Sequence, residues 1–470
     1  MKKAPSIAIV GGGFSGAAVA FHLARARVQA DIIVFEPRAR LGGGLAYGGD
    51  DPIHRVNVPA TRMSIIPEDG EHFARWLAAS GALARDNAAH AGGEVYPRRS
   101  AFGRYVEETL RPWVVAGAVR HVRASVVSMR KAADGWRLRT EDGETFRADL
   151  AAIATTHPAP ALPPHLRAFG GDPRLIADPL VDNVVAGLAG RERVLIVGAG
   201  LTAADLVAAL EARAHLGPIT MISRRGLRAR GRSLSSFAPE GDFLHPPSRA
   251  ASDLLARVRA AVSAAERGGR NWQAVIEGVR NQGQDIWRAL DADARRRIVR
   301  HLRPFWDAHR FRAAPQIEAI VDRKLKLGTL ALKRAHLGVV SRNHAGFAVE
   351  LRDGRTGGCE IGVFDRIIVA VGPAHHDILR SQAFLAELGE AGIAATDATK
   401  LGLWTSREGR AIGADGVPNP TLFVAGPLAR GAFGELMGLP QVSVYAQFIA
   451  NQLVSALSVL ERREKTPARV

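Results

Sequence analysis

A glycine-rich loop near the start of the sequence has the spacing of a pyrophosphate-binding turn. The short apolar run 7–10 has the character of a buried strand and leads directly into the pattern G-x-G-x-x-G, after which small residues continue as a helix. The first glycine permits the tight turn, the second lets a pyrophosphate approach the backbone, and the third lets helix and strand pack closely. The phosphates would then lie at the helix N-terminus. The loop residues are Gly11, Gly12, Gly13, Phe14, Ser15 and Gly16.

An acidic residue stands where a ribose would need it. The next strand-like run, 31–35, ends in Glu36, which lies 20 residues beyond Gly16. A carboxylate at this offset accepts hydrogen bonds from ribose hydroxyls and repels a 2′-phosphate. A glycine-rich turn that binds nothing would leave Glu36 unexplained. The first loop is therefore predicted to bind FAD.

A second loop repeats this spacing with a different ending. The buried run 193–197 leads into Gly198, Gly200 and Ala203 in the pattern G-x-G-x-x-A. The following strand ends in Ser223, Arg224 and Arg225, again at an offset of 20 residues. Serine and arginine bind a 2′-phosphate that an acid would repel, so this loop is predicted to bind NADPH. The alternative is that the two arginines form an ordinary solvated basic turn.

The composition limits the other classes of function. Cys359 is the single cysteine of the 470 residues, which excludes a redox-active dithiol and an internal disulfide. The net charge of +17 permits attraction to nucleic acid or to anionic membranes. However, the arginines are spread along the chain and no basic segment is interleaved with aromatic residues. His301 and His309 lack a third ligand at metal spacing, so no metal is predicted.

The positions of the strands predict an α/β protein with two Rossmann-like dinucleotide-binding domains, the NAD(P) domain being inserted in the FAD domain. Strand-like runs recur around residues 150–154, 365–370 and 421–425, and residues 252–314 are polar, rich in arginine and helical in pattern. We expect an FAD-binding domain over residues 1–188, an inserted NAD(P)-binding domain with a helical segment over 189–330, and the last part of the FAD domain over 331–470. The sequence has no uninterrupted run of about eighteen apolar residues, so no membrane-spanning helix is predicted. The expected location is the cytoplasm.

Further motifs carry a resemblance to a known family. They include Gly42-Gly43-Gly44-Leu45-Ala46-Tyr47-Gly48, Asn57-Val58-Pro59-Ala60-Thr61-Arg62-Met63-Ser64, Tyr96-Pro97-Arg98-Arg99, Arg303-Pro304-Phe305-Trp306-Asp307-Ala308-His309-Arg310 and Gly426-Pro427-Leu428-Ala429-Arg430-Gly431. With the first glycine loop, these residues resemble the single-component flavin monooxygenases, a group with bacterial FAD-dependent urate hydroxylases and aspartate N-monooxygenases. Ornithine and lysine N-hydroxylases and the dimethylaniline-type monooxygenases are more distantly similar.

The resemblance implies roles for these residues. The loop with Gly43 and Tyr47, and the segment with Asn57, Arg62 and Met63, would line the isoalloxazine ring. Arg98 would lie near the flavin or its phosphates. Two departures stand out: proline follows Gly426 where most two-nucleotide flavoproteins have an acid that holds the ribitol, and the turn at Thr155 lacks the usual glycine. Gly426 and Pro427, at the end of the last predicted strand, are expected to contact FAD.

Without the family resemblance, the residue types alone permit more than one role for several of these residues. Tyr47 suits either stacking or half-buried packing, and Asn57 suits either the flavin edge or a turn. The last helix opens near Pro440, and its N-terminus would stabilise negative charge on reduced flavin if it points at the ring. The segment from Trp306 to Arg310 is either a substrate lid or a basic helix packed by its tryptophan.

The resemblance and the absence of a dithiol together predict the reaction. NADPH would reduce FAD, and the reduced flavin would pass its electrons to dioxygen and hydroxylate a small nitrogen-containing substrate, of the urate or amino-acid class, through a flavin hydroperoxide. No catalytic side chain is assigned and the oligomeric state is open. The alternatives are an FAD-dependent NAD(P)H reductase or oxidase without hydroxylation, and a basic flavin-containing module that binds nucleic acid.

Overall fold

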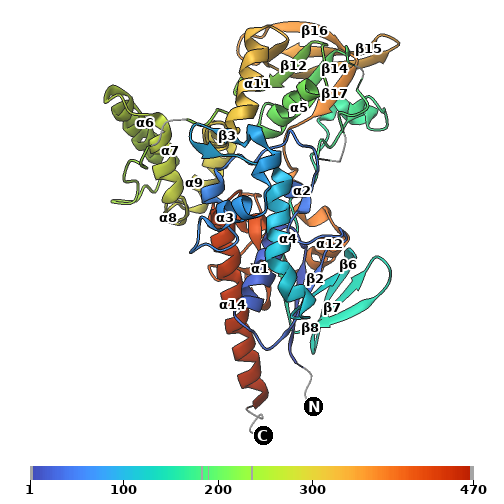
Figure 1. The fold of residues 1–470 in the computed structure, drawn as a ribbon, viewed down its shortest axis with the longest axis vertical. Helices are drawn as coiled ribbons and strands as arrows, with labels where there is room; N and C mark the ends of the chain where they lie inside the picture. The colour runs from blue at the N-terminus through green and yellow to red at the C-terminus, as the bar shows by residue number, and fades with distance from the viewer. Residues whose placement is uncertain (1–3, 181–183, 189, 234–236, 466–470) are drawn as a thin grey trace.

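The computed structural model describes residues 4–180, 184–188, 190–233 and 237–465. Two parallel sheets dominate it, one in each half of the molecule, and a separate group of helices stands beside them (Figure 1). This arrangement confirms the predicted α/β class with two dinucleotide-binding folds.

The first sheet is built from both ends of the chain. Its strand order is β18-β19-β9-β1-β2-β5, and the strands from β19 to β5 run parallel. The last strand of the chain, β19, pairs with β9 and so returns to the sheet that β1 began. The prediction that one nucleotide domain is inserted in the other is therefore confirmed by strand order. The strands are β1 (Ser6–Val10), β2 (Asp31–Phe35), β5 (Val119–Val122), β9 (Leu150–Ile153), β18 (Arg410–Ile412) and β19 (Pro418–Val424).

Helices cover this first sheet. They are α1 (Phe14–Arg25), α4 (Arg99–Val115) and α14 (Gln441–Lys465), and α3 (His72–Ala79) packs on α4. α14 packs along α1, and its segment 441–462 is long and apolar enough to cross a membrane by length and composition alone, with half of its most apolar window buried inside the protein. Ile449, Leu453 and Leu457 of this helix join the main hydrophobic core. Its apolar character is thus explained by packing in the first domain.

The second sheet has the order β10-β17-β11-β12-β13, all parallel, with α5 and α11 packed together against it. The predicted limits of this domain, 189 and 330, are wrong at both ends. β10 precedes residue 189, and β17 pairs with β11 far beyond residue 330. The elements are β10 (Leu175–Ile176), β11 (Val194–Val197), α5 (Leu201–Ala212), β12 (Ile219–Ser223), α11 (Pro315–Lys326), β13 (Leu330–Arg334) and β17 (Arg366–Val369).

Three small antiparallel sheets complete the two domains. β14 to β16 share a core with the second sheet, to which Phe347 and Val349 contribute beside Leu195 and Ile367. β6 to β8 lead into β9 of the first sheet, where α12 (Ala383–Glu390) packs on β6. The strands are β3 (His90–Ala91), β4 (Glu94–Val95), β6 (Val126–Ala132), β7 (Gly135–Thr140), β8 (Thr145–Ala148), β14 (His336–Asn343), β15 (Gly346–Arg352) and β16 (Cys359–Phe364).

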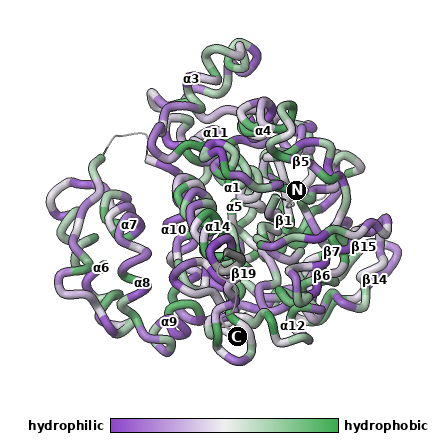
Figure 2. Tube along the Cα trace, turned by 90° about the horizontal axis from the view of Figure 1, so that it is seen from below, coloured by the Kyte–Doolittle hydropathy of each residue, from purple (hydrophilic) through white to green (hydrophobic). Residues whose placement is uncertain are grey.

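A layer of helices with its own small core stands beside the two domains. Phe243, Val275, Ile286 and Leu290 are buried there. Figures 1 and 2 show α6 to α9 to one side of the molecule, next to α10 and α14. The helical pattern predicted for residues 252–314 is confirmed. The elements are α6 (Ala251–Arg267), α7 (Trp272–Asn281), α8 (Gly283–Ala289), α9 (Ala292–Arg297), the π-helical turn η5 (Ile298–Leu302) and α10 (Arg303–Arg310).

Candidate functional site

The first glycine loop has the backbone that its sequence predicts. Gly11 has φ +102°, and a Cβ there would lie 2.7 Å from the carbonyl oxygen of Ala154 on the neighbouring strand end. A Cβ on Gly16 would lie 1.8 Å from the carbonyl oxygen of Gly11, so only glycine lets α1 pack against this turn. Gly13 caps α1 without any side-chain hydrogen bond to the helix. The first N–H groups of α1 are thus available to an anion.

Glu36 is positioned beside this loop. It is buried at the end of β2, where its carboxylate accepts hydrogen bonds from the backbone N–H of Gly12 at 3.1 Å and from the side chain of Arg38 at 3.0 Å. These contacts hold the carboxylate against the glycine loop. A role as the ribose acceptor remains a prediction, and the structure supplies the proximity that the role requires.

The segment from Gly42 to Tyr47 lies against the first loop. A Cβ on Gly44 would be 3.0 Å from the Cα of Gly13, and one on Gly43 would be 3.0 Å from the Cα of Gly48, in the short helix α2 (Gly44–Tyr47). The ring of Tyr47 packs edge-on against Phe102, with centroids 4.7 Å apart. Burial raises the pKa of Tyr47 to about 12, so its hydroxyl stays protonated. Of the two roles open to Tyr47, the geometry favours packing.

The final strand of the chain ends at the same place. Gly426 has φ +78°, and a Cβ there would lie 2.3 Å from the Oγ of Ser15. Pro427 then opens a single 3₁₀ turn, η7 (Gly426–Ala429), which leads into α13 (Arg430–Phe433). The turn after β19 therefore meets the N-terminus of α1, although it carries proline where an acid was expected.

The remaining predicted flavin residues have mixed surroundings. Met63 is buried in the main core, whereas Arg62 is exposed. The Nδ2 of Asn57 donates a hydrogen bond to the carbonyl oxygen of Arg312 at 3.2 Å, which joins this segment to the end of α10. Arg98 begins α4, and its buried Nε has no hydrogen-bond partner within the described residues. This Nε lies 3.9 Å from the Oδ1 of Asp86, so it has an ion pair with that carboxylate and can still donate a hydrogen bond.

The second glycine loop is more open than the first. Gly198 has φ +122°, and a Cβ there would lie 2.2 Å from the carbonyl oxygen of Ala370, so this turn also requires glycine. A Cβ on Gly200 would meet nothing within 4 Å, whereas Ala203 is fully buried against the sheet. Gly200 caps α5 without a side-chain hydrogen bond. The space over Gly200 and the uncapped helix end fit a dinucleotide.

The three residues after β12 differ in their surroundings. Ser223 donates from its hydroxyl to the carbonyl oxygen of Leu227 at 2.8 Å. Arg224 and Arg225 are exposed, and the guanidinium of Arg225 lies 4.9 Å from the ring centroid of Phe305 on α10. Arg225 therefore makes a cation–π contact with the helical layer, while Arg224 extends into solvent.

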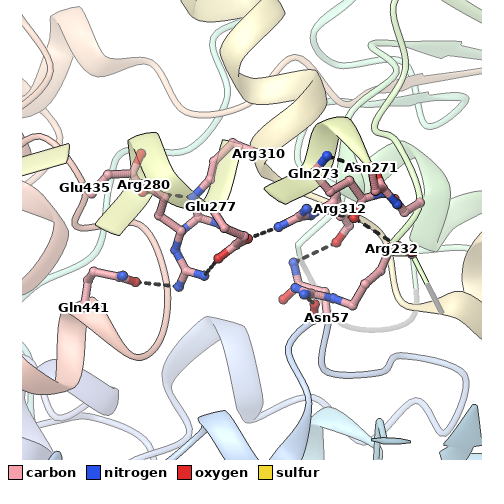
Figure 3. Close-up of polar contacts among 12 residues, drawn as sticks. Asn57, Arg232, Asn271, Gln273, Glu277, Arg280, Arg310, Arg312, Glu435 and Gln441 are labelled. Atoms are coloured by element: carbon pink, nitrogen blue, oxygen red, sulfur yellow. Dashed lines mark hydrogen bonds and ion pairs between the residues drawn. The ribbon is translucent and has the colours of Figure 1, made fainter. Parts of the chain in front are cut away.

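Sequence reasoning missed a buried ionic network between the helical layer and the first domain (Figure 3). Glu277 of α7 pairs with Arg280 at 3.0 Å and with Arg312. Arg280 also donates to the carbonyl oxygen of Leu439 at 2.9 Å and to the side chain of Gln441 at 2.7 Å. These bonds join α7 to the N-terminus of α14. Burial lowers the pKa values of both arginines to about 10, so they remain charged near neutral pH.

The network holds more positive than negative charge. Arg310 pairs with Glu435 at 3.0 Å, and Arg232 donates to the backbone oxygen of Asn57 at 3.0 Å. Among the residues drawn in Figure 3, the four arginines 232, 280, 310 and 312 face only the two carboxylates of Glu277 and Glu435. Three of these arginines keep a buried Nε without a hydrogen-bond partner in the part of the chain described. Such an excess favours an anionic group close by.

A second buried cluster lies where the chain crosses between the domains. His157 follows β9 and His375 follows β17, and their ring centroids are 4.6 Å apart. The Nη2 of Arg303 donates to the Nε2 of His375 at 3.0 Å. Burial, reinforced by nearby charged groups, lowers the pKa of His157 to about 3 and that of His375 to about 2. Both imidazoles are therefore neutral near pH 7 and unsuited to proton transfer there.

The helical layer forms a half-open cavity of about 600 Å³. Its walls come from α6, α7, α8, η5 and α10, together with Arg430, Gly434 and Glu435 of the segment that follows β19. The wall is mainly apolar: Leu254, Leu255, Val258, Val262, Trp272, Ile276, Val279, Ile286, Trp287, Leu290, Ile298, Val299, Leu302, Phe305 and Trp306 line it. The charged residues that line it are Arg230, Arg259, Glu266, Arg303, Arg430 and Glu435. A concave apolar pocket with a few converging polar groups is the usual form of a small-molecule site.

Two other features have simpler explanations. Cys359 is exposed on β16, where its thiol donates to Glu350 at 3.0 Å. Within residues 4–180, 184–188, 190–233 and 237–465, no three side chains of His, Cys, Asp or Glu gather as metal ligands.

Comparison with known proteins agrees with this geometry. Residues 8–158 match a family model described as FAD-NAD(P)-binding. No curated protein sequence matches the chain. The chain is similar to the reduced form of an ornithine hydroxylase from Pseudomonas aeruginosa, with a TM-score of 0.65 and 16% identity over 97% of this chain and 100% of the other.

Two further solved structures share the architecture. A cadaverine monooxygenase from Erwinia amylovora, solved with FAD bound, has a TM-score of 0.65 at 13% identity and covers 98% of this chain and 95% of its own. An L-lysine 6-monooxygenase from Pseudomonas syringae has a TM-score of 0.61 at 16% identity, with 97% and 99% covered. The chain therefore has the fold of these monooxygenases, which confirms the resemblance at the level of the fold.

Proposed function

We propose that this chain is an FAD- and NADPH-dependent monooxygenase that hydroxylates a small nitrogen-containing substrate. The observation that carries the proposal is the pair of glycine loops, each at the carboxyl end of parallel strands, together with a cavity lined by the helical layer. The solved structures that share the fold are an ornithine hydroxylase, an L-lysine 6-monooxygenase and a cadaverine monooxygenase, and ornithine, lysine and cadaverine each carry an amino group.

The residues of the first domain fit FAD. The uncapped N-terminus of α1 and the side-chain-free Gly13 would hold the pyrophosphate, and Glu36 would accept hydrogen bonds from the ribose. Arg98 has an unused Nε that would donate to a phosphate. When bound, FAD supplies the redox chemistry between NADPH and dioxygen.

The other groups would bind NADPH and shape the space for reaction. The open face of Gly200 and the uncapped α5 would take its pyrophosphate, and Arg224 and Arg225 would bind its 2′-phosphate. The surplus of buried arginines around Glu277 would stabilise negative charge at the junction of the domains. The helical layer would exclude water from the reaction, which favours hydroxylation over loss of reducing equivalents to peroxide.

The test is a substrate screen with the purified holoenzyme. NADPH consumption, hydrogen peroxide and hydroxylated product are measured with no addition and with urate, aspartate, ornithine or lysine. The proposal expects one nitrogen-containing compound to accelerate NADPH consumption with matching hydroxylated product. NADPH consumption that yields only peroxide with every compound would instead identify a reductase or oxidase, and a strongly salt-dependent affinity for RNA or DNA without turnover would identify a nucleic-acid-binding module.

A further inference from the structure

The large cavity differs from a pocket for a compact polar molecule. Three of the seven tryptophans of the chain, Trp272, Trp287 and Trp306, line it together with aliphatic side chains of α6 and α7. Its volume of about 600 Å³ lies within the range of pockets that enclose drug-sized ligands. Apolar walls of this extent stabilise a ligand in proportion to the apolar surface that it removes from water. The cavity therefore favours an occupant with a sizeable apolar body.

One charged group in the wall of the cavity has no hydrogen-bond acceptor. Arg430 lines the cavity and is only 5% exposed. The nearest carboxylate oxygen is the Oδ1 of Asp307, at 3.9 Å, which is beyond hydrogen-bond distance. Among the described residues the guanidinium of Arg430 has this long ion pair and no hydrogen bond, and the Oδ1 of Asp307 likewise has no hydrogen bond.

Each of the two neighbouring carboxylates forms hydrogen bonds with another side chain. The Oδ2 of Asp307 accepts from the Nε of Arg303 at 3.2 Å. Glu435 accepts from the Nε of Arg310 at 3.0 Å and from the indole N–H of Trp306 at 3.0 Å. The charged groups that face Arg430 are therefore two further arginines and two carboxylates, which leaves one positive charge in excess.

This excess is costly unless an anion joins it. Burial lowers the pKa of Arg430 and raises that of Asp307, so the surroundings disfavour both charges in the absence of a partner. A carboxylate would satisfy the fork of the guanidinium with two parallel hydrogen bonds.

We propose that the cavity is the substrate pocket and that its substrate has an apolar body and one carboxylate, which Arg430 binds. This inference rests on the proposed function and names the class of molecule that the site takes. The carboxylate of the substrate would lie on the side of the first domain. Arg430 directly follows η7, and Gly426 of η7 packs against Ser15 of the first glycine loop. The apolar body extends into the helical layer, where α6 and α7 supply the wall. Urate and ornithine lack such a body, so they are poor matches for this pocket.

The first test compares two probes that differ only in charge. Octanoate and octanamide are titrated into the purified holoenzyme by calorimetry, without NADPH, so that binding is measured apart from turnover. We expect octanoate to bind at least tenfold more tightly than octanamide, a difference of about 1.4 kcal/mol. Equal affinities of the two probes, or no binding of octanoate, would overturn the inference.

Variants then locate the charge and the apolar wall. Arg430→Met should abolish the preference for octanoate, whereas the control Arg267→Met, which removes an exposed charge at the end of α6, should preserve it. Val258→Trp should lower the affinity for octanoate at least tenfold, because the larger side chain fills part of the cavity. An unchanged preference in Arg430→Met, or an equal loss in Arg267→Met, contradicts the assignment.

The two proposals fail in different ways. If octanoate binds as expected but no compound gives hydroxylated product, the cavity assignment stands and the monooxygenase proposal fails. If a nitrogen-containing compound is hydroxylated while octanoate neither binds nor competes with it, the monooxygenase proposal stands and the substrate class is wrong.

Discussion

The two glycine loops share one spacing but have different surroundings. The first is covered: Gly13 lies against Gly44, Glu36 is buried beside it, and the turn at Gly426 closes on Ser15. The second is open: nothing lies within 4 Å of a Cβ on Gly200, and both arginines after β12 are exposed. A covered loop suits a cofactor that stays bound, and an open one suits a cosubstrate that exchanges in each cycle.

The largest effect is expected at the covered loop. Gly13→Val should abolish flavin binding, because the branched side chain would meet Gly44 and occupy the space that the pyrophosphate needs. The measurement is the flavin absorbance of the purified variant, with circular dichroism to show that it is folded. A folded variant with full flavin content would mean that FAD binds elsewhere.

The matched change at the open loop should act on a different nucleotide. Gly200→Val should keep flavin content unchanged, because a side chain there meets no other residue. It should raise the KM for NADPH at least tenfold by blocking the approach to the N-terminus of α5. Steady-state kinetics and flavin content of the same preparation check this, and loss of flavin from this variant would remove the distinction between the loops.

The exposed arginines should set the choice of nicotinamide cosubstrate. Arg224→Ala with Arg225→Ala should raise the KM for NADPH at least tenfold, since each charge-assisted bond to the 2′-phosphate contributes about 1.5–3 kcal/mol. The KM for NADH should hardly change. The single variants sharpen this expectation, because Arg225 also contacts Phe305 and its loss should perturb the helical layer. Equal losses for the two cosubstrates would mean that the arginines serve the fold.

A smaller effect is expected from the buried imidazoles. The pKa of His375 is about 2 in the folded protein and near 6.5 when unfolded, so the unfolded state takes up a proton first as the pH falls. The contribution of His375 to the free energy of unfolding is fully present above pH 6.5. It decreases as the pH falls below 6.5, by at most about 1.4 kcal/mol per pH unit. His375→Gln, whose amide oxygen can still accept from Arg303, should flatten the dependence of unfolding free energy on pH between 6 and 4. Urea titrations at several pH values measure this, and an unchanged slope would contradict the assigned pKa.

No effect is expected from the single cysteine. Cys359→Ser should leave the rate of flavin reduction by NADPH unchanged, because the thiol is exposed on β16 and has no second thiol to form a dithiol. Rapid-mixing kinetics of the two proteins compare the rates. A large decrease in a well-folded variant would reveal a role for this thiol in electron transfer.

Local features of the sequence predicted the two loops well. Gly11 and Gly198 have positive φ and Gly16 packs on the carbonyl oxygen of Gly11, which are requirements within one strand–turn–helix unit, so spacing alone places these glycines. The domain limits were wrong because β17 joins the second sheet by pairing with β11, which is far away in sequence. The same holds for the site: Glu277 and Arg312 meet through tertiary packing, as do Arg430 and Asp307, and nothing in the sequence indicates either pairing.

The most direct test of the account is an anaerobic titration of the purified holoenzyme with NADPH and, separately, with NADH. The account predicts that NADPH bleaches the flavin absorbance, that NADH requires at least tenfold higher concentrations, and that the Gly200→Val variant retains its flavin but resists reduction by NADPH. Flavin that stays oxidised with NADPH, or that is reduced equally by both nucleotides in wild type and variant, would contradict the assignment of FAD to the first loop and NADPH to the second.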